Sequence, residues 1–516
     1  MSLNDNPLLT VHLFVSEKHS PWNGMKDMLN RLTENGITVN LYEPHDALVD
    51  INPKYPRVYL SLGTEWEEFL TLNSLPLHER KRWLHFTSAA EIEPSKLFYC
   101  WLSSTDPLLK NRKLPFTKFS SDTPLVSVFT ASYKSKEKIQ RPYCSLLNQT
   151  YPNWEWVIVD DSGDEDETYR NDLLPLKDSR VRRYRQDSRN GYIGAVKRYA
   201  AGLCTGEILV EVDHDDDLTP DCLEKIVQAF IQHPECGFAF GENAEVYVDS
   251  HHSHWYGWDC GFGYSMYYRV WVHEMNRWQN VMKQTTLNGT TIRHLVGLPN
   301  HPRAWTRDCY HLIGGHREDL LVSDDYDLLV RTFLSTKFVA IPHLLYLQYR
   351  NENGDNSTFQ RNQQIQILCR ELESYYQQRI NTKLNELGLP EEVEYSRVWE
   401  RSTDDPARKS AHIIHEDPSK VSFLFPIPYS YPANEHPELF KTLQKGLETN
   451  FKDIEVVVVG HVPAEIENFA SKAPQGAIRW WPMEFDDSLE TCTQYAKLCS
   501  SCTEKVVVLP ELLQGS

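Results

Sequence analysis

Residues 211–217, Glu-Val-Asp-His-Asp-Asp-Asp, gather several carboxylates at a point where the chain should leave a strand. The apolar residues 208–210 predict a buried strand before them, and Leu-Thr-Pro-Asp at 218–221 is typical of a helix start. Open α/β sheets bind their ligands at the carboxyl ends of such strands. Carboxylates packed this closely repel one another, and a hard divalent cation removes that repulsion. We therefore expect a cation site at Asp215 and Asp213, with a solvated acidic turn as the alternative.

A second acidic motif, Asp324-Asp325-Tyr326-Asp327, stands where another helix should begin. The apolar residues 328–330 continue the helical pattern, and a helix N-terminus stabilises negative charge. Asp325 is therefore expected to stay ionised and to accept a proton as a general base, while Asp324 positions the site. A pair of carboxylates that only caps the helix is the alternative.

Two further segments offer groups that suit a nucleotide. Residues 156–161 predict a strand that ends in Asp160 and Asp161, and a carboxylate there can accept hydrogen bonds from a nucleobase N–H or a ribose hydroxyl. Gly191 precedes a predicted helix that carries Lys197, whose ammonium could reach a diphosphate as a point charge. The alternatives are a simple helix cap for the two aspartates and a solvated helix face for Lys197.

The segments that must position these residues alternate between strand-like and helix-like patterns, which predicts parallel α/β sheets. Residues 1–120 form one Rossmann-like α/β unit, without a Gly-x-Gly-x-x-Gly fingerprint. Residues 121–390 form a second α/β unit that ends in a long helix over 360–388. The charged, proline-containing residues 391–419 are expected to be a linker, and residues 420–516 form a third unit.

Six short motifs follow one another at regular spacing between residues 124 and 355. They are Val126-Ser127-Val128-Phe129-Thr130-Ala131-Ser132-Tyr133, Val159-Asp160-Asp161, Asn190-Gly191-x-x-Gly194-Ala195, Asp213-His214-Asp215, Arg307 with Ile313-Gly314-Gly315, and Asp324-Asp325-Tyr326-Asp327-Leu328-Leu329-Val330-Arg331. Together they make this part of the chain resemble a family 2 glycosyltransferase of the GT-A fold.

The resemblance implies a metal-dependent, inverting transfer of a sugar from a nucleotide-diphosphate donor to an acceptor hydroxyl. A UDP-sugar is the expected donor, a glycan is the expected acceptor, and Mn²⁺ or Mg²⁺ bound at Asp215 and Asp213 is the expected cofactor. Asp325, with Asp324, is the catalytic pair that the resemblance implies. The residues that it assigns to the donor are Ala131, Ser132, Tyr133, Asp160, Asp161, Gly191, Lys197 and Asp213.

The two flanking units carry weaker patterns. Residues 23–39 faintly resemble the N-terminal half of GT-B glycosyltransferases, so the N-terminal unit is expected to be accessory. The C-terminal unit repeats three strands of the central one, at offsets of 295, 300 and 297 residues: Val126 recurs as Val421, Trp154 as Ile454 and Gly206 as Thr503. Gly460 and Pro510 replace the carboxylates in this repeat. We therefore expect a truncated GT-A-like half domain that binds no donor.

Aromatic residues gather between the two acidic motifs, and aromatic rings stack on sugars. Trp258, His301 and Trp305 are the candidate acceptor residues, and ordinary core positions are the alternative. His251-His252-x-His254 is expected to be a solvated loop rather than a metal site.

The composition limits the remaining function classes. The 516 residues include 53 basic and 72 acidic ones, and the net charge of −19 disfavours loose binding to nucleic acid or anionic membranes. Six basic residues within 177–189 keep a modified base in DNA as an alternative acceptor, and a non-catalytic sugar-binding scaffold is the second alternative. No signal-peptide pattern opens the chain, no apolar run suggests a membrane span, and eleven cysteines without framework spacing favour a reducing compartment. We therefore expect a cytoplasmic protein.

Overall fold

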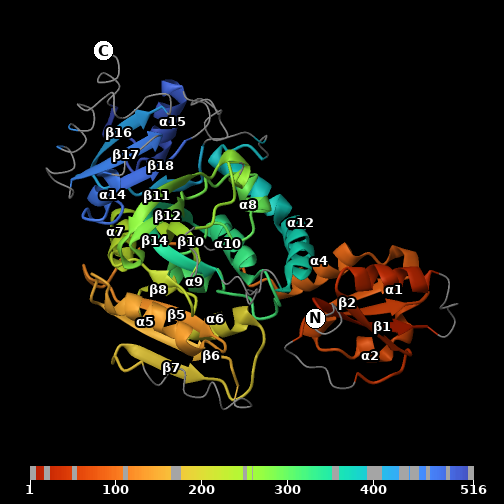
Figure 1. The fold of residues 1–516 in the computed structure, drawn as a ribbon. Coiled ribbons are helices and arrows are strands. Elements are labelled where there is room, and N and C mark those ends of the chain that lie inside the picture. Colours follow the sequence, from red (N-terminus) through yellow and green to blue (C-terminus); the bar gives the residue numbers. More distant parts are fainter. Residues whose placement is uncertain are drawn as a thin grey trace.

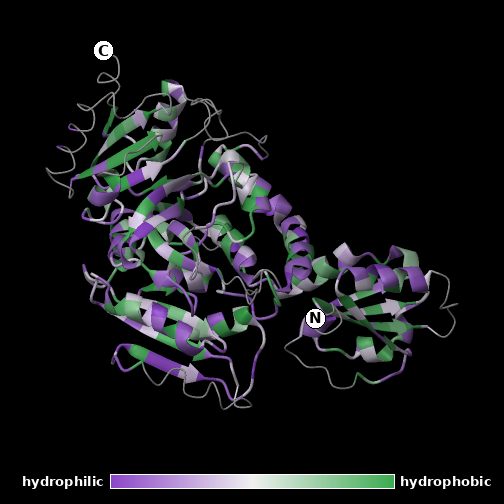
Figure 2. Cartoon of the chain, viewed as in Figure 1, coloured by the Kyte–Doolittle hydropathy of each residue, from purple (hydrophilic) through white to green (hydrophobic). Residues whose placement is uncertain are grey.

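The computed structural model describes most of the chain and contains two sheets, one of four strands and one of fifteen (Figure 1). The described residues are 7–16, 24–48, 55–108, 114–163, 176–247, 253–258, 260–350, 360–391, 395, 409–428, 441, 445, 453–460, 465–483 and 488–508. The strands are predominantly hydrophobic, while polar residues follow the outer faces of the helices (Figure 2). The expected α/β class is confirmed.

The N-terminal unit is a parallel four-stranded sheet with strand order β2-β1-β3-β4. Its strands are β1 (Leu9–Val15), β2 (Ile37–Tyr42), β3 (Arg57–Leu62) and β4 (Trp83–Phe86). Its helices are α1 (Met25–Glu34), α2 (Leu70–Asn73), α3 (Leu77–Arg80) and α4 (Pro94–Thr105). Strands alternate with helices, as the sequence pattern predicts, because each parallel pair needs a crossover connection.

The N-terminal unit contacts the long helix α12 (Asn362–Leu387) through the end of helix α4 (Figure 1). Asp106, which follows α4, accepts hydrogen bonds of 2.8 Å from the Tyr375 hydroxyl and from Nη1 of Arg379, both on α12. Trp101 on α4 donates from Nε1 to Asp319 of the central unit at 2.8 Å. The two units are therefore joined by directed polar contacts as well as by packing.

The central unit begins with four parallel strands in the order β8-β5-β6-β7. They are β5 (Val126–Ser132), β6 (Trp154–Asp160), β7 (Val181–Arg185) and β8 (Ile208–Glu211). The helices among them and after them are α5 (Gln140–Leu147), α6 (Ile193–Gly202) and α7 (Cys222–Gln232). Since β6 is buried along its whole length, its continuous apolar sequence is that of a covered parallel strand.

The sheet continues past β8 through strands of mixed direction. These strands are β9 (Asp217–Leu218), β10 (Cys236–Tyr247), β11 (Tyr267–Val272), β12 (Arg277–Met282), β13 (Arg303–Thr306) and β14 (Lys337–Arg350), with helices α8 (Thr291–His294), α9 (Arg307–Leu312) and α10 (Asp324–Ser335). Part of the expected linker is also sheet, because β15 (His412–Ile414) pairs with β14 in parallel. The sequence-based linker assignment is therefore wrong for these residues.

The C-terminal unit repeats the strand order of the central one. Its strands β16 (Val421–Ile427), β17 (Ile454–Gly460), β18 (Ile478–Trp481) and β19 (Val506–Val508) have the order β19-β16-β17-β18. Its described helices include α14 (Glu465–Ala470) and α15 (Leu489–Cys499). The unit joins the central sheet where β18 pairs with β11, at Trp480 and Arg269.

A buried polar network is repeated along with the strands. Glu155 on β6 accepts a hydrogen bond from Ser127 at 2.6 Å and forms an ion pair with Arg182 at 2.9 Å. Glu455 on β17 accepts from Ser422 at 2.5 Å and pairs with Arg479 at 3.2 Å. In both units the arginine also donates to the carbonyl oxygen that ends a helix region, Leu203 in one and Cys499 in the other. The two units are thus copies of one scaffold.

All eleven cysteines are free thiols. Among the helices of the described residues, none has both the length and the apolar character that crossing a bilayer requires.

We predict that Glu455→Ala destabilises the protein by about 3–5 kcal/mol, because it removes the nearer of the two carboxylates that pair with the fully buried Arg479 guanidinium, and Glu242 at 3.9 Å is the other. Chemical denaturation measures the change. Glu504→Gln, at an exposed position of the same unit, is the control and should leave the denaturation midpoint in place. Equal midpoints for Glu455→Ala and wild type would contradict the importance of the network.

Candidate active site

Three strand ends meet at one edge of the central sheet. The Asp161 amide, after β6, donates to the Ser132 carbonyl at the end of β5 at 2.8 Å. The Thr130 hydroxyl on β5 donates to the Val212 carbonyl after β8 at 2.8 Å. The loops that carry the expected donor and metal residues are therefore tied to one another, as the parallel order β8-β5-β6 requires.

A buried ammonium lies among the carboxylates at this edge. Nζ of Lys197 on α6 is 2.5 Å from Oε1 of Glu211 and 3.8 Å from Oδ1 of Asp213, and the residue is only 7% exposed. The solvated helix face that was the alternative for Lys197 is therefore wrong. Burial alone would raise the pKa of Glu211, but the Lys197 ammonium and the nearby His301 and His316 rings hold that pKa well below its ordinary value.

Two histidines complete the surroundings of Glu211. Nε2 of His301 lies 3.6 Å from Oε1 of Glu211, and Nε2 of His316 lies 3.6 Å from Oε2. His316 is held by Tyr310, whose hydroxyl is 2.8 Å from Nδ1 of the ring. His316 Nε2 is also 3.9 Å from Oδ2 of Asp324, so it connects the end of β8 with the start of α10.

Sequence reasoning assigned no role to Glu211 or His316. The signal that could have found Glu211 is a charged residue at the end of an otherwise apolar strand. For His316, the signal is a polar ring directly after the Gly314-Gly315 pair. Neither signal indicates which residue the side chain contacts, since Glu211 and His316 are more than a hundred positions apart in the chain.

The start of α10 presents the second acidic motif as expected. Asp324 is buried, and burial raises its pKa despite the opposing charges of Lys197 and His316. The Asp325 carboxylate is 30% exposed, and its Oδ2 lies 3.4 Å from Nη2 of Arg303. Asp325 is therefore the member of the pair that a substrate can reach, while Asp324 faces the buried cluster.

Close packing brings α6 against this motif. A Cβ atom on Gly194 would lie 2.4 Å from the Arg317 carbonyl and 3.0 Å from the Asp324 Cβ, so a larger residue would push the two segments apart. The glycine in the Asn190-Gly191-x-x-Gly194 motif thus allows the helix that carries Lys197 to approach the acidic pair.

The carboxylates after β8 divide into two groups. Asp216 is buried and accepts hydrogen bonds from the Tyr346 hydroxyl at 2.9 Å and the Tyr349 amide at 2.8 Å, and Asp217 accepts from the Tyr349 hydroxyl at 2.8 Å. Asp213 and Asp215 are only partly buried. These two carboxylates fit Mg²⁺ or Mn²⁺, which prefer oxygen ligands and accept substrate phosphates beside them.

A second group of side chains that could bind a metal ion includes Asp213 as well. One ligand atom each of Glu211, Asp213 and His301 lies within 4.8 Å of the others, which is close enough for a shared ion. The Lys197 ammonium already stands 2.5 Å from Glu211, however, and a cation there would repel it. The buried ammonium therefore disfavours an ion between Glu211 and His301, and the cation site at Asp213 and Asp215 stays a prediction.

The expected nucleoside residues lie together at the ends of β5 and β6. Asp161 is buried, and its two carboxylate oxygens accept from the amides of Asn190 at 2.6 Å and Gly191 at 3.0 Å. Gly191 has φ 79°, a conformation that favours glycine. Asp161 thus shapes the turn before α6. Its contact with a nucleobase stays a prediction.

The remaining residues assigned to the donor differ in their exposure to solvent. Asp160 is buried and accepts a hydrogen bond from the Ser162 hydroxyl at 2.6 Å. Ser132 is also buried, with its hydroxyl 2.6 Å from that of Ser135, whereas Ala131 is only partly buried. Tyr133 is 36% exposed, and the Arg189 guanidinium lies 4.4 Å from its ring centroid. The exposed Tyr133 ring therefore offers a nucleoside a surface to stack on.

The candidate acceptor residues do not form one surface. Trp305 is 0% exposed and donates from Nε1 to Thr332 at 3.1 Å, so it is a core residue and the expected acceptor contact is wrong. His301 is buried and stacks on Tyr346 with centroids 4.9 Å apart. Trp258 is partly buried against Trp481, at 5.4 Å. His251 and His252 lie outside the described residues.

The basic segment that suggested a DNA acceptor is partly neutralised. Arg180 forms an ion pair with Asp178 at 2.7 Å, and Arg182 pairs with Glu155 at 2.9 Å. These pairs reduce the positive charge that could follow a phosphate backbone.

Part of the chain is similar to known glycosyltransferases. Residues 127–293 match the family model described as glycosyl transferase family 2. A putative colanic acid biosynthesis glycosyl transferase, WcaA of Escherichia coli K12, is 32% identical over 102 residues, which are 20% of this chain and 36% of that protein. The E. coli enzyme named UDP-Glc:alpha-D-GlcNAc-diphosphoundecaprenol beta-1,3-glucosyltransferase WfgD is 29% identical over 125 residues, 24% of this chain and 47% of WfgD. The chain thus spans less than half the length of these two curated relatives.

Among solved structures, Staphylococcus aureus TarS 1-349 in complex with UDP-GlcNAc is similar over 44% of this chain and 59% of that one, with 16% identity and a TM-score of 0.34. The family match covers the strand ends, the buried Lys197 and the acidic residues after β8. Residues 127–293 therefore form a glycosyltransferase domain of family 2, and the α/β architecture fits the GT-A fold.

Proposed function

We propose that the central unit transfers a sugar from a nucleotide-diphosphate donor, a UDP-sugar, to a hydroxyl of a glycan. The observation that carries the proposal is the contact chain from Asp213 through Lys197, Glu211 and His316 to Asp324, which brings the two acidic motifs to one site. The name of the relative WfgD, which contains UDP-Glc and a sugar-bearing acceptor, supports the donor and acceptor classes.

The residues take separate roles in an inverting single displacement. Asp325 accepts the proton of the acceptor hydroxyl as that oxygen bonds to the anomeric carbon, and the bond from this carbon to the diphosphate oxygen breaks. Nη2 of Arg303, 3.4 Å from Oδ2 of Asp325, orients the carboxylate. Asp213 and Asp215 would hold Mg²⁺ or Mn²⁺, which supplies positive charge to the leaving diphosphate.

Lys197 and Glu211 act below the reacting atoms. Lys197 is buried against Glu211, so its main role in this proposal is to hold the Asp213 carboxylate in place. Direct contact between Lys197 and the diphosphate is its lesser role. The C-terminal unit contributes no donor site to this reaction, since glycine stands at position 460 where the central unit has Asp160.

We predict that transfer requires a divalent cation and that Asp215→Asn lowers turnover by at least about two orders of magnitude, the scale of losing a principal charge stabiliser. Initial rates with and without excess chelator, and cation titration of the variant, measure the effect. Asp221→Asn, a carboxylate just beyond this site, should keep the wild-type rate. Full activity in excess chelator would overturn the assignment.

We predict that Asp325→Asn retains donor binding while single-turnover transfer falls by about two to four orders of magnitude, because the amide keeps the shape and loses the proton affinity. Asp324→Asn should be milder. Asp308→Asn, an exposed acidic residue in the first turn of α9, is the matched control. Loss of donor binding in Asp325→Asn, or near wild-type transfer, would show that another group is the base.

A further inference from the structure

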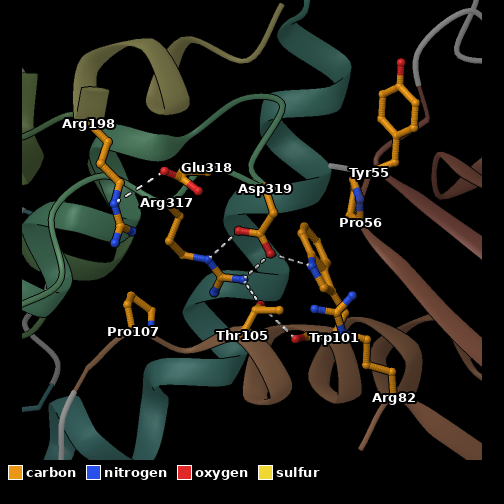
Figure 3. A pocket seen from close by; sticks show the side chains of 10 residues that line it. All are labelled: Tyr55, Pro56, Arg82, Trp101, Thr105, Pro107, Arg198, Arg317, Glu318 and Asp319. Atoms are coloured by element: carbon orange, nitrogen blue, oxygen red, sulfur yellow. Dashed lines mark hydrogen bonds and ion pairs between the residues drawn. The ribbon is translucent and has the colours of Figure 1, made fainter. Parts of the chain in front are cut away.

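The segment 314–323, which precedes the acidic motif of α10, is packed against the end of helix α4 in the N-terminal unit. Figure 3 shows the side chains around a pocket of about 200 Å³ at this place. Trp101 and Thr105 on α4 and Arg317 and Asp319 in the segment form what we term the α4 contact. Because Arg317 already pairs with Asp319 at 3.0 Å, we interpret these charges as a link between the two units instead of a ligand site.

The polar bonds of the α4 contact meet at the Arg317 guanidinium. Arg317 is 2% exposed, and it donates to both carboxylate oxygens of Asp319 at 3.0 Å and to the Thr105 hydroxyl (Figure 3). Trp101 donates from Nε1 to the same carboxylate at 2.8 Å. A buried charge is costly without such partners, so these bonds fix the guanidinium. The position of Arg317 is therefore set by α4 as well as by its own segment.

Close packing of the backbone adds a second constraint on the segment. Gly314 has φ 82°, and a Cβ atom there would lie 2.6 Å from the Cβ of Pro107, two residues beyond the end of α4. On another side, a Cβ atom on Gly194 of α6 would lie 2.4 Å from the Arg317 carbonyl oxygen. The segment is therefore in tight contact with both the N-terminal unit and the helix that carries Lys197.

The same segment determines where α10 begins. Nη1 of Arg317 lies 4.0 Å from Oδ1 of Asp327 in the first turn of α10, so one guanidinium contacts both α4 and the acidic motif. His316, its neighbour in the chain, has Nε2 3.9 Å from Oδ2 of Asp324. Ser323, directly before the helix, has φ 60°, a conformation that a residue with a side chain keeps only when its surroundings impose it. The start of α10 is thus placed by the contacts of the preceding segment.

We propose that Arg317 is a positioning residue through which helix α4 of the N-terminal unit sets the position of the Asp325 carboxylate. Arg317 is buried at the α4 contact, so it acts through the chain between 317 and 325 and not on the reacting atoms. A misplacement of about 1 Å that arises far from the chemistry can cost about 100-fold in rate. Because Asp325 is the base only in the proposed function, the inference rests on that function.

A second contact between the N-terminal unit and the rest of the chain provides a matched control. Asp106 accepts hydrogen bonds of 2.8 Å from Tyr375 and Arg379 of α12, and neither donor belongs to the segment 314–323. If docking of the N-terminal unit were all that mattered, weakening either contact would have the same effect. If Arg317 positions the acidic motif, only the α4 contact affects turnover.

The first test compares the rate of turnover with donor affinity in the full chain. Turnover is followed as UDP release from UDP-glucose and UDP-N-acetylglucosamine with Mn²⁺, where water takes the place of the acceptor hydroxyl. We expect Thr105→Val to lower the single-turnover rate by about tenfold, the scale of a lost hydrogen bond to a charged group, and Arg317→Lys to lower it at least as much. Thr105→Ser, which keeps the hydroxyl, and Tyr375→Phe should keep the wild-type rate. UDP affinity and the melting temperature should be those of wild type in Thr105→Val.

The second test needs no turnover. Hydrogen–deuterium exchange of residues 314–327 should be faster in Thr105→Val and Arg317→Lys, and should match wild type in Thr105→Ser and Tyr375→Phe. Unchanged exchange and unchanged UDP release in both Thr105→Val and Arg317→Lys would overturn the inference, and so would an equal loss of rate in Tyr375→Phe. Absence of UDP release by the wild-type chain, together with the expected exchange pattern, would count against the proposed function and leave the link from α4 to the acidic motif supported.

Discussion

The pairing of Lys197 with Glu211 is the interaction on which the site depends. The buried Glu211 and Asp324 and the partly buried Asp213 bring carboxylates to one cluster. At an effective dielectric constant of about 20, two like charges 4 Å apart repel by about 4 kcal/mol. The Lys197 ammonium, 2.5 Å from Glu211, offsets this repulsion from within the cluster. The approach of α6 that this requires is possible because Gly194 has no side chain.

The same scaffold without this cluster appears in the C-terminal unit. The strand order and the Ser–Glu–Arg network are repeated there, so the stabilising part of the architecture has been kept. At Gly460, which corresponds to Asp160, φ is 108° and a Cβ atom would lie 1.6 Å from the Ile427 carbonyl oxygen. A carboxylate cannot be introduced at this position without moving the backbone, so the local conformation itself requires the glycine.

Most of the correct predictions of strands and helices came from local sequence patterns. The apolar runs of β5, β6 and β8 and the periodicity of α12 are contained in single segments, so their positions could be predicted. Trp305 could not, because a tryptophan in the core and one beside a sugar have the same local sequence signal. The pairing of β15 with β14 and the contacts of His316 with Glu211 join distant segments, and short-range patterns do not specify such pairs.

The joint between the central and C-terminal units is a brief strand pairing within one continuous sheet. β18 registers with β11 through the single pair of Trp480 and Arg269, whereas β17 and β18 register over four pairs. Little main-chain pairing therefore joins the two units, and side-chain packing such as that of Trp278 against Trp480, with ring centroids 5.3 Å apart, supplies the rest of the contact between them.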